Sequence, residues 1–150
     1  MFRTGVLTAL LLAGVSSPAL AAAKNVSGIY GEIRMSRGTG DLGGVQVQIF
    51  DDPKNPRVEI LECEGWCHCW SKANLRRDGD RFSFDVVEVS FFSGDPKQPH
   101  RQTIHYAGRF VGRELTLTGQ SGADPAWPLG RLKRQKQRFL ANDPLPECPR

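Results

Sequence analysis

Apolar and polar residues alternate with a period of two along most of the chain, which is typical of half-buried β-strands. The clearest run covers residues 45–50, where Val45, Val47 and Ile49 alternate with two glutamines. Glycine, Asp-Gly and proline clusters separate such runs and predict about seven or eight strands joined by short connections. We therefore expect a mainly β protein, a small antiparallel meander that forms a barrel or a sandwich.

Further details of the pattern predict how these strands connect and bend. Residues 57–63 and 66–77 are expected to form two strands on either side of a turn at Glu64-Gly65. Asp78-Gly79 is a strong signal for a two-residue hairpin turn into the next strand. In that strand the parity of the apolar positions changes after Val86, which we interpret as a β-bulge at a barrel corner.

The pattern changes after Pro128, where the spacing of apolar residues becomes that of an α-helix. Good helix formers separate the apolar positions, which are Leu129, Leu132, Phe139 and Leu140. The spacing predicts a basic C-terminal helix packed against the barrel, followed by a short tail. The alternative is a last, highly charged edge strand, in which Lys and Arg would discourage aggregation through the sheet edge.

The N-terminal segment has the composition of a targeting signal. Arg3 precedes an apolar run over Val6–Val15 and a tail of small residues. This order predicts a secretory signal peptide over residues 1–21, with cleavage after Ala23 as the alternative, and a single β domain over residues 22–150. The apolar run is about half as long as a membrane-spanning helix. We therefore expect an exported protein, periplasmic or secreted, without a membrane span.

Four cysteines, Cys63, Cys67, Cys69 and Cys148, form an even set, which in an exported protein indicates two disulfides. A three-residue loop between the strands would place Cys63 opposite Cys67 and leave Cys69 to pair with Cys148. A two-residue loop would exclude that pairing, so the connectivity stays open. A metal or redox role is the rival hypothesis, but within one strand His68 points away from the face of Cys67 and Cys69.

The same alternation places Trp66, His68 and Trp70 together on the face opposite Cys67 and Cys69. If the cysteine face is interior, this stripe faces solvent and is a candidate binding surface. The alternative is that both tryptophans belong to the core, since large aromatic side chains usually supply burial.

Positive charge is concentrated near the C-terminus of a chain with a net charge of +4. The cluster consists of Arg131, Lys133, Arg134, Lys136 and Arg138. It is a candidate anion-binding surface for an acidic partner, and the alternative is a solvated face of the expected helix. The export signal and the absence of a nucleic-acid-binding motif in the sequence argue against a nucleic acid partner.

Few residues of the sequence form a pattern that indicates chemistry. His100 and His105 lie close together, but no spacing fixes a nucleophile, a base and an orienting group. Residues 38–43 match G-x-G-x-x-G, yet a strand follows them where the dinucleotide fingerprint requires a helix. We therefore expect no enzyme activity, no cofactor and no bound metal.

The segment Ser27-Gly28-Ile29-Tyr30 gives the expected first strand a glycine-containing start. In this and in its meander of strands the chain resembles the lipocalins, a likeness of architecture rather than of diagnostic motifs. If the barrel encloses a ligand cavity, its walls are expected to include Ile33, Val47, Phe84 and Tyr106.

The leading hypothesis is therefore an exported β-barrel protein that binds a small apolar ligand or a protein, without catalytic activity. The alternative is an exported inhibitor or immunity-type protein that blocks another protein through its polar loops, 36–44, 93–101 and 121–127. A metal or redox protein built on the cysteine cluster is the third hypothesis.

Overall fold

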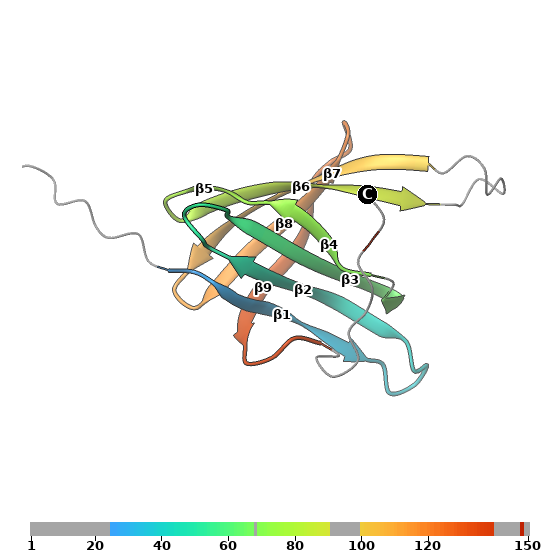
Figure 1. The fold of residues 1–150 in the computed structure, drawn as a ribbon. Helices are drawn as coiled ribbons and strands as arrows, with labels where there is room; N and C mark the ends of the chain where they lie inside the picture. Colours follow the sequence, from blue (N-terminus) through green and yellow to red (C-terminus); the bar gives the residue numbers. More distant parts are fainter. Residues whose placement is uncertain (1–24, 68, 91–99, 140–147, 149–150) are drawn as a thin grey trace, which may run out of the picture.

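The structure, a computed structural model, describes residues 25–67, 69–90, 100–139 and 148 of the 150-residue chain. These residues form one sheet of nine antiparallel strands (Figure 1). The strands are β1 (Gly28–Met35), β2 (Leu42–Phe50), β3 (Arg57–Cys67), β4 (Ser71–Asn74), β5 (Arg76–Asp78), β6 (Arg81–Ser90), β7 (His100–Val111), β8 (Glu114–Ser121) and β9 (Trp127–Gln135). The predicted antiparallel meander is confirmed, whereas the expected signal peptide lies outside the described residues.

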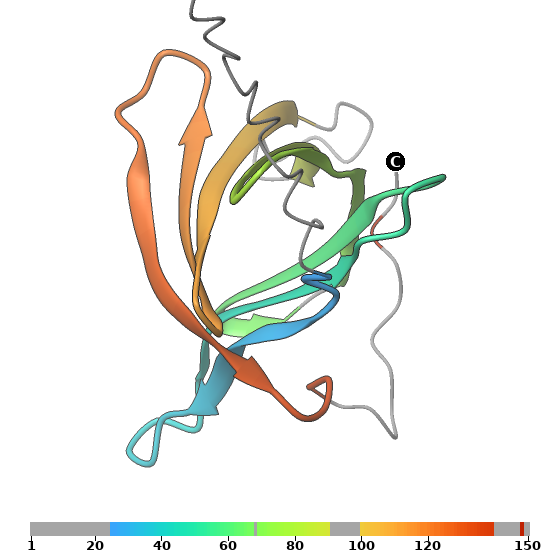
Figure 2. The same ribbon diagram turned by 90° about the vertical axis from the view of Figure 1, so that its left-hand side faces the viewer.

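The sheet curls into a nearly closed barrel because its two outer members, β4 and β5, are halves of one bent segment. Only Leu75 separates them in the sequence, yet β4 pairs with β3 and β5 pairs with β6. Figure 2 shows the ring that results. At the other junction β1 meets β9 through two residue pairs, Ile29 with Gln135 and Tyr30 with Arg134. This short contact is the seam of the barrel.

Alternate side chains of β1–β3 and β6–β9 fill the barrel interior. Val45, Val47 and Ile49 are buried there, as their alternation predicts, and Phe84 and Tyr106 stack beside them with 4.9 Å between ring centroids. Fully burying one such apolar side chain stabilises the fold by roughly 1.5–3 kcal/mol. Three of the four residues expected to wall a cavity therefore belong to a packed core cluster.

A second apolar cluster lies on the outer face of β1, β2 and β3. It is built from Leu61, Cys63 and Trp70, and Ile33 packs against it rather than in the main core. Ile33 was expected to line an internal cavity, and this expectation is wrong. Tyr30 occupies the inner face of β1 instead, where its hydroxyl donates a 2.8 Å hydrogen bond to a backbone carbonyl.

The chain beyond β9 covers this outer cluster. The Phe139 backbone N–H donates to Gln46 Oε1 at 2.7 Å. The Arg138 guanidinium lies 3.8 Å from the centre of the Trp70 ring and 3.0 Å from a Glu59 carboxylate oxygen. These contacts explain why Gln46 and Glu59 are buried although they point away from the barrel interior.

The predicted C-terminal helix is wrong, because residues 127–135 form β9 and no helix occurs in the described part of the chain. The register between β8 and β9 shifts at Leu117 and Thr118, where one extra residue of β9 is accommodated. This shift places Leu129 and Leu132 against the same core. A three-residue spacing that imitates a helix therefore arises from a bulged strand.

Two other details of the predicted strands are also corrected. β6 pairs with β7 without any register shift, so the bulge expected after Val86 is absent there. β3 runs through the expected turn to Cys67, and the chain reverses within it at Gly65, which has a φ of 86°. The Cα atoms of Cys63 and Cys67 are 4.5 Å apart, whereas four residues of straight strand would span about 13 Å.

Candidate functional site

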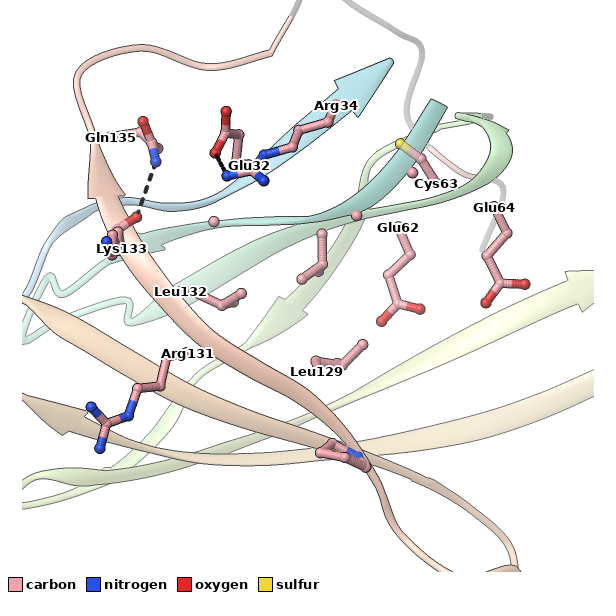
Figure 3. A pocket seen from close by; sticks show the side chains of 15 residues that line it. Glu32, Arg34, Glu62, Cys63, Glu64, Leu129, Arg131, Leu132, Lys133 and Gln135 are labelled. Carbon is pink, nitrogen blue, oxygen red and sulfur yellow. Dashed lines mark hydrogen bonds and ion pairs between the residues drawn. The ribbon is translucent and has the colours of Figure 1, made fainter. Parts of the chain in front are cut away.

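A cleft opens in the barrel wall where β1 and β9 separate beyond their short seam. Its volume is about 580 Å³, and β1, β2, β3 and β9 contribute its lining (Figure 3). Val45, Leu129 and Leu132 provide apolar lining that is continuous with the core. The cleft therefore connects the solvent with the inner face of the sheet.

Glycines in the lining explain why the cleft exists. Gly31, with a φ of 88°, directly follows the last β1 residue that pairs with β9, so β1 departs from extended geometry where the two strands part. A Cβ atom at Gly31 would lie 2.1 Å from the Val45 carbonyl oxygen, which only glycine avoids. At Gly43, by contrast, the nearest atom to such a Cβ is 4.0 Å away, so this lining position is empty rather than crowded.

Glu62 lies at the inner end of the cleft. It is in phase with Val58 and Ile60 on β3, whose side chains belong to the core, so its carboxyl group faces inward. The Tyr106 hydroxyl donates a hydrogen bond to this carboxyl group. Glu62 Oε1 is shielded from solvent and accepts no hydrogen bond from any described residue.

The surroundings of Glu62 favour its protonated form. Burial raises the pKa of this carboxyl, and the charges of Glu88 and Glu64 raise it further, whereas the Tyr106 hydrogen bond opposes them. Burial also raises the pKa of Tyr106, followed by the effect of Glu62. A carboxyl group with a raised pKa inside a cleft marks a candidate functional site.

Polar side chains of β6, β7 and β8 form a group near Glu62, whose pKa is raised by the charge of Glu88. Gln102 donates a 2.9 Å hydrogen bond to Glu88, and the Ser121 hydroxyl lies 3.4 Å from the Gln102 side-chain oxygen. Glu88 is in phase with the buried Phe84 and Val86 of β6. Glu88 itself is exposed, so this polar group borders the solvent, whereas the apolar core lies farther along β6.

The outer edge of the cleft carries positive charge. Arg131 and Lys133 are both exposed residues of β9, line the cleft, and form no ion pair with any residue in the described ranges. Arg34 is already paired with Glu32 at 2.7 Å, and this hydrogen bond lowers the pKa of Glu32. Figure 3 shows that the acidic and basic side chains lie on different strands of the cleft, with Glu62 on β3 and Lys133 on β9.

The five basic residues predicted to share a helix face do not form one surface. Arg131 and Lys133 line the cleft, whereas Arg134 donates a 2.7 Å hydrogen bond to the Ser27 carbonyl. Lys136 is exposed beyond β9, and Arg138 lies over Trp70 on the outer cluster. Only two of the five therefore contribute to the candidate site.

The predicted tryptophan stripe is divided. Trp66 is 68% exposed, whereas Trp70 is 1% exposed beneath Arg138. His68 lies outside the described residues. The expected aromatic binding surface is thus not formed by the two tryptophans, because the chain reverses between Cys63 and Cys67 and the covering segment buries Trp70.

The cysteines form two disulfides, Cys63–Cys67 and Cys69–Cys148. The expectation of two disulfides is confirmed, and the connectivity, which the sequence left open, is the one that a three-residue loop would give. All four thiols are consumed, so they do not form the thiolate metal site considered above. Across the described ranges, no group of three or more His, Cys, Asp and Glu residues is placed to hold a metal ion.

The histidines singled out in the sequence lie away from the cleft lining. His105 Nδ1 is 2.7 Å from an Asp85 carboxylate oxygen on the outer face of β6 and β7, where both side chains are partly exposed. His100 is an exposed residue at the start of β7. Sequence reasoning instead missed Glu62 and Glu88, although each interrupts the inward-facing apolar phase of its strand.

Comparison with protein-family models, with curated proteins and with solved structures found no match for this chain. The part of the chain that the structure describes contains no helix of the length and apolar character that crossing a membrane requires. The described residues form a nearly closed β-barrel with a lateral cleft, and the Glu62 carboxyl group lies at the inner end of this cleft.

Proposed function

We propose that this protein is an exported β-barrel binding protein that takes a small polar ligand into the cleft between β1 and β9. The observation that carries the proposal is the Glu62 carboxyl group, which lies at the inner end of the cleft with Oε1 lacking a partner among the described residues. Leaving a buried polar group unsatisfied costs about 1–3 kcal/mol. A hydrogen-bond donor on a ligand would remove that cost.

The size and lining of the cleft support a small-molecule ligand. A volume of about 580 Å³ falls within the roughly 300–1,000 Å³ of typical ligand pockets. Apolar groups of Leu129 and Leu132 supply contact area, and a few polar groups supply orientation, which is the usual composition of such sites. The carboxyl group favours a polar ligand over the apolar ligand suggested by the sequence.

The disulfides support the extracytoplasmic part of the proposal. Two disulfides in one small domain are compatible with an oxidising compartment, where such bonds persist. The signal peptide over residues 1–21 stays a prediction, which N-terminal sequencing of the protein after export would test.

A cleft-blocking variant tests the binding site. Gly43→Trp fills the cleft from a position with room for a side chain, and Gly38→Trp is the matched control in the exposed β1–β2 turn, where a Cβ also meets nothing within 4 Å. Ligand-observed NMR with a library of polar fragments should detect binding to the wild type and to Gly38→Trp. The Gly43→Trp variant should lose it. Fragments that bind all three proteins equally would contradict the proposal.

A second candidate function, the loop-mediated inhibitor, is favoured by two exposed side chains at one end of the sheet. Met35 is 66% exposed and Trp66 is 68% exposed. They lie at the same end of β1 and β3 with β2 between them, since Met35 pairs with Leu42 and Leu42 pairs with Gly65. Retention of a stoichiometric protein partner from an extracytoplasmic fraction by the wild type, and its loss with Trp66→Ser, would support this function.

A further inference from the structure

We propose that the ligand of the cleft is zwitterionic, with its cationic group against Glu62 and its anionic group against Arg131 and Lys133. This inference rests on the proposed function and names the chemical class of the ligand. It follows from the distribution of charge along the cleft, which places acidic groups at one wall and basic groups at the other.

The inner wall favours a cation. Glu62 and Glu64 both line the cleft from β3, and Glu88 is close enough to affect the charge of Glu62. The ionised carboxyl groups would repel an anion, whereas an ammonium group beside Glu62 would offset the effects of Glu88 and Glu64 and favour the ionised form of Glu62. An ammonium also has the N–H donors that Glu62 Oε1 lacks.

The outer wall favours an anion. Arg131 and Lys133 are two residues apart on β9, so their side chains share one face of the strand, while Leu132 between them packs into the core. Neither cation forms an ion pair within the described part of the chain. A carboxylate or phosphate group of the ligand can therefore contact both cations without displacing an existing partner.

The position of the two walls sets the length of the ligand. β2 and β1 lie between β3 and β9, so three inter-strand steps separate Glu62 from Lys133. At about 4.8 Å per step this is about 14 Å along the curved wall. The straight path through the opening is shorter, and because Leu132 packs into the core, the Arg131 and Lys133 side chains lie on the outer face of β9, where the anionic end of the ligand would leave the cleft. A short linear chain with opposite charges at its ends therefore fits better than a compact ion.

Three probes with the same six-carbon chain separate the contributions: 6-aminohexanoate, hexylamine and hexanoate. Amide chemical shifts of the cleft residues, followed during titration, give each dissociation constant. The zwitterion should bind about five-fold or more tightly than either singly charged probe, which corresponds to one additional solvent-exposed ion pair. Equal affinity of hexylamine and 6-aminohexanoate would overturn the anionic half of the inference.

Two variants should act on different ends of the probe. Glu62→Gln should weaken binding of 6-aminohexanoate and hexylamine about five-fold or more and leave hexanoate unchanged. Lys133→Gln should weaken 6-aminohexanoate and hexanoate and leave hexylamine unchanged, and Lys136→Gln, which does not line the cleft, is the control. Weaker binding of hexanoate to Glu62→Gln, with hexylamine binding unchanged, would place Glu62 against the anionic end and overturn the inference.

The outcomes also separate this inference from the proposed function. If the three probes leave the cleft residues unchanged while other polar fragments bind there and are blocked by Gly43→Trp, the zwitterionic ligand is wrong and the binding site stands. If no fragment of any charge perturbs the cleft residues, both are wrong.

Discussion

Removing the Cys69–Cys148 disulfide should destabilise the barrel more than removing Cys63–Cys67. The two bonds close loops of very different length, because their sequence separations are 79 and 4 residues. The chain-entropy relation gives about 4.5 kcal/mol for the long loop and about 2 kcal/mol for the short one. The long-range bond is therefore expected to contribute most of the disulfide stabilisation.

Contacts in the folded state change the expected stability losses for the two disulfides without changing which loss is larger. The Cys148 backbone N–H donates a 3.0 Å hydrogen bond to the Trp70 carbonyl, and releasing the tail would lose about 1 kcal/mol more. Cys63 is buried in the outer cluster, so truncating it to alanine adds about 1 kcal/mol on that side. The expected totals are about 5.5 and about 3 kcal/mol.

Urea unfolding of the double variants C69A/C148A and C63A/C67A measures both terms against the wild type. The first variant should have the lower midpoint and also the steeper urea dependence, because its unfolded chain exposes more surface. Unfolding of that variant without urea would agree with the same reasoning, since small domains have only about 5–15 kcal/mol of stability. Equal losses, or a larger loss for C63A/C67A, would refute the loop-closure argument.

Three other side chains give predictions for the same unfolding assay. Glu62→Gln should raise the free energy of unfolding at pH 7 but not near pH 4. The reason is the raised pKa of this carboxyl, because of which its stabilising contribution is lost as pH rises through the folded-state value; a pH-independent effect would contradict this. Arg138→Gln should lower the free energy of unfolding by about 2 kcal/mol, because it leaves the buried Glu59 without its closer cation. The control Lys136→Gln at an exposed position should change it by less than about 0.5 kcal/mol, and equal effects would count against the ion pair. Gly31→Ala should lower the free energy of unfolding by about 3 kcal/mol or more, because its Cβ would lie 2.1 Å from a β2 carbonyl oxygen. A variant as stable as the wild type would show that β1 does not bend there.

The sequence predicts those strands whose two faces differ cleanly in polarity. Val45, Val47 and Ile49 keep strict alternation, and β2 lies as expected, with these side chains in the core. β9 was mistaken for a helix because the inserted residue in its bulge puts Leu129 and Leu132 on one side of the strand with three-residue spacing. Hydrophobic spacing alone does not distinguish such a bulged strand from a short helix.

The candidate site was missed because its residues break the local pattern. Glu88 occupies the position where the apolar phase of Phe84 and Val86 on β6 would continue, but it is exposed, and the sequence pattern was explained as a bulge. Glu62 interrupts the inward phase of β3 in the same way. Polar residues at core positions are found mainly at functional sites, so an inward-facing Glu was the available signal. The cleft itself depends on how β1 and β9 diverge, which sequence spacing does not encode.

Intermolecular NOEs between a bound polar fragment and the methyl groups of the protein test the central claim most directly. If the cleft is the binding site, NOEs should connect the fragment with the methyl groups of Leu129 and Leu132, and they should vanish in Gly43→Trp but persist in Gly38→Trp. NOEs confined to the exposed Met35 methyl group at the other surface, or unchanged NOEs in Gly43→Trp, would contradict the account.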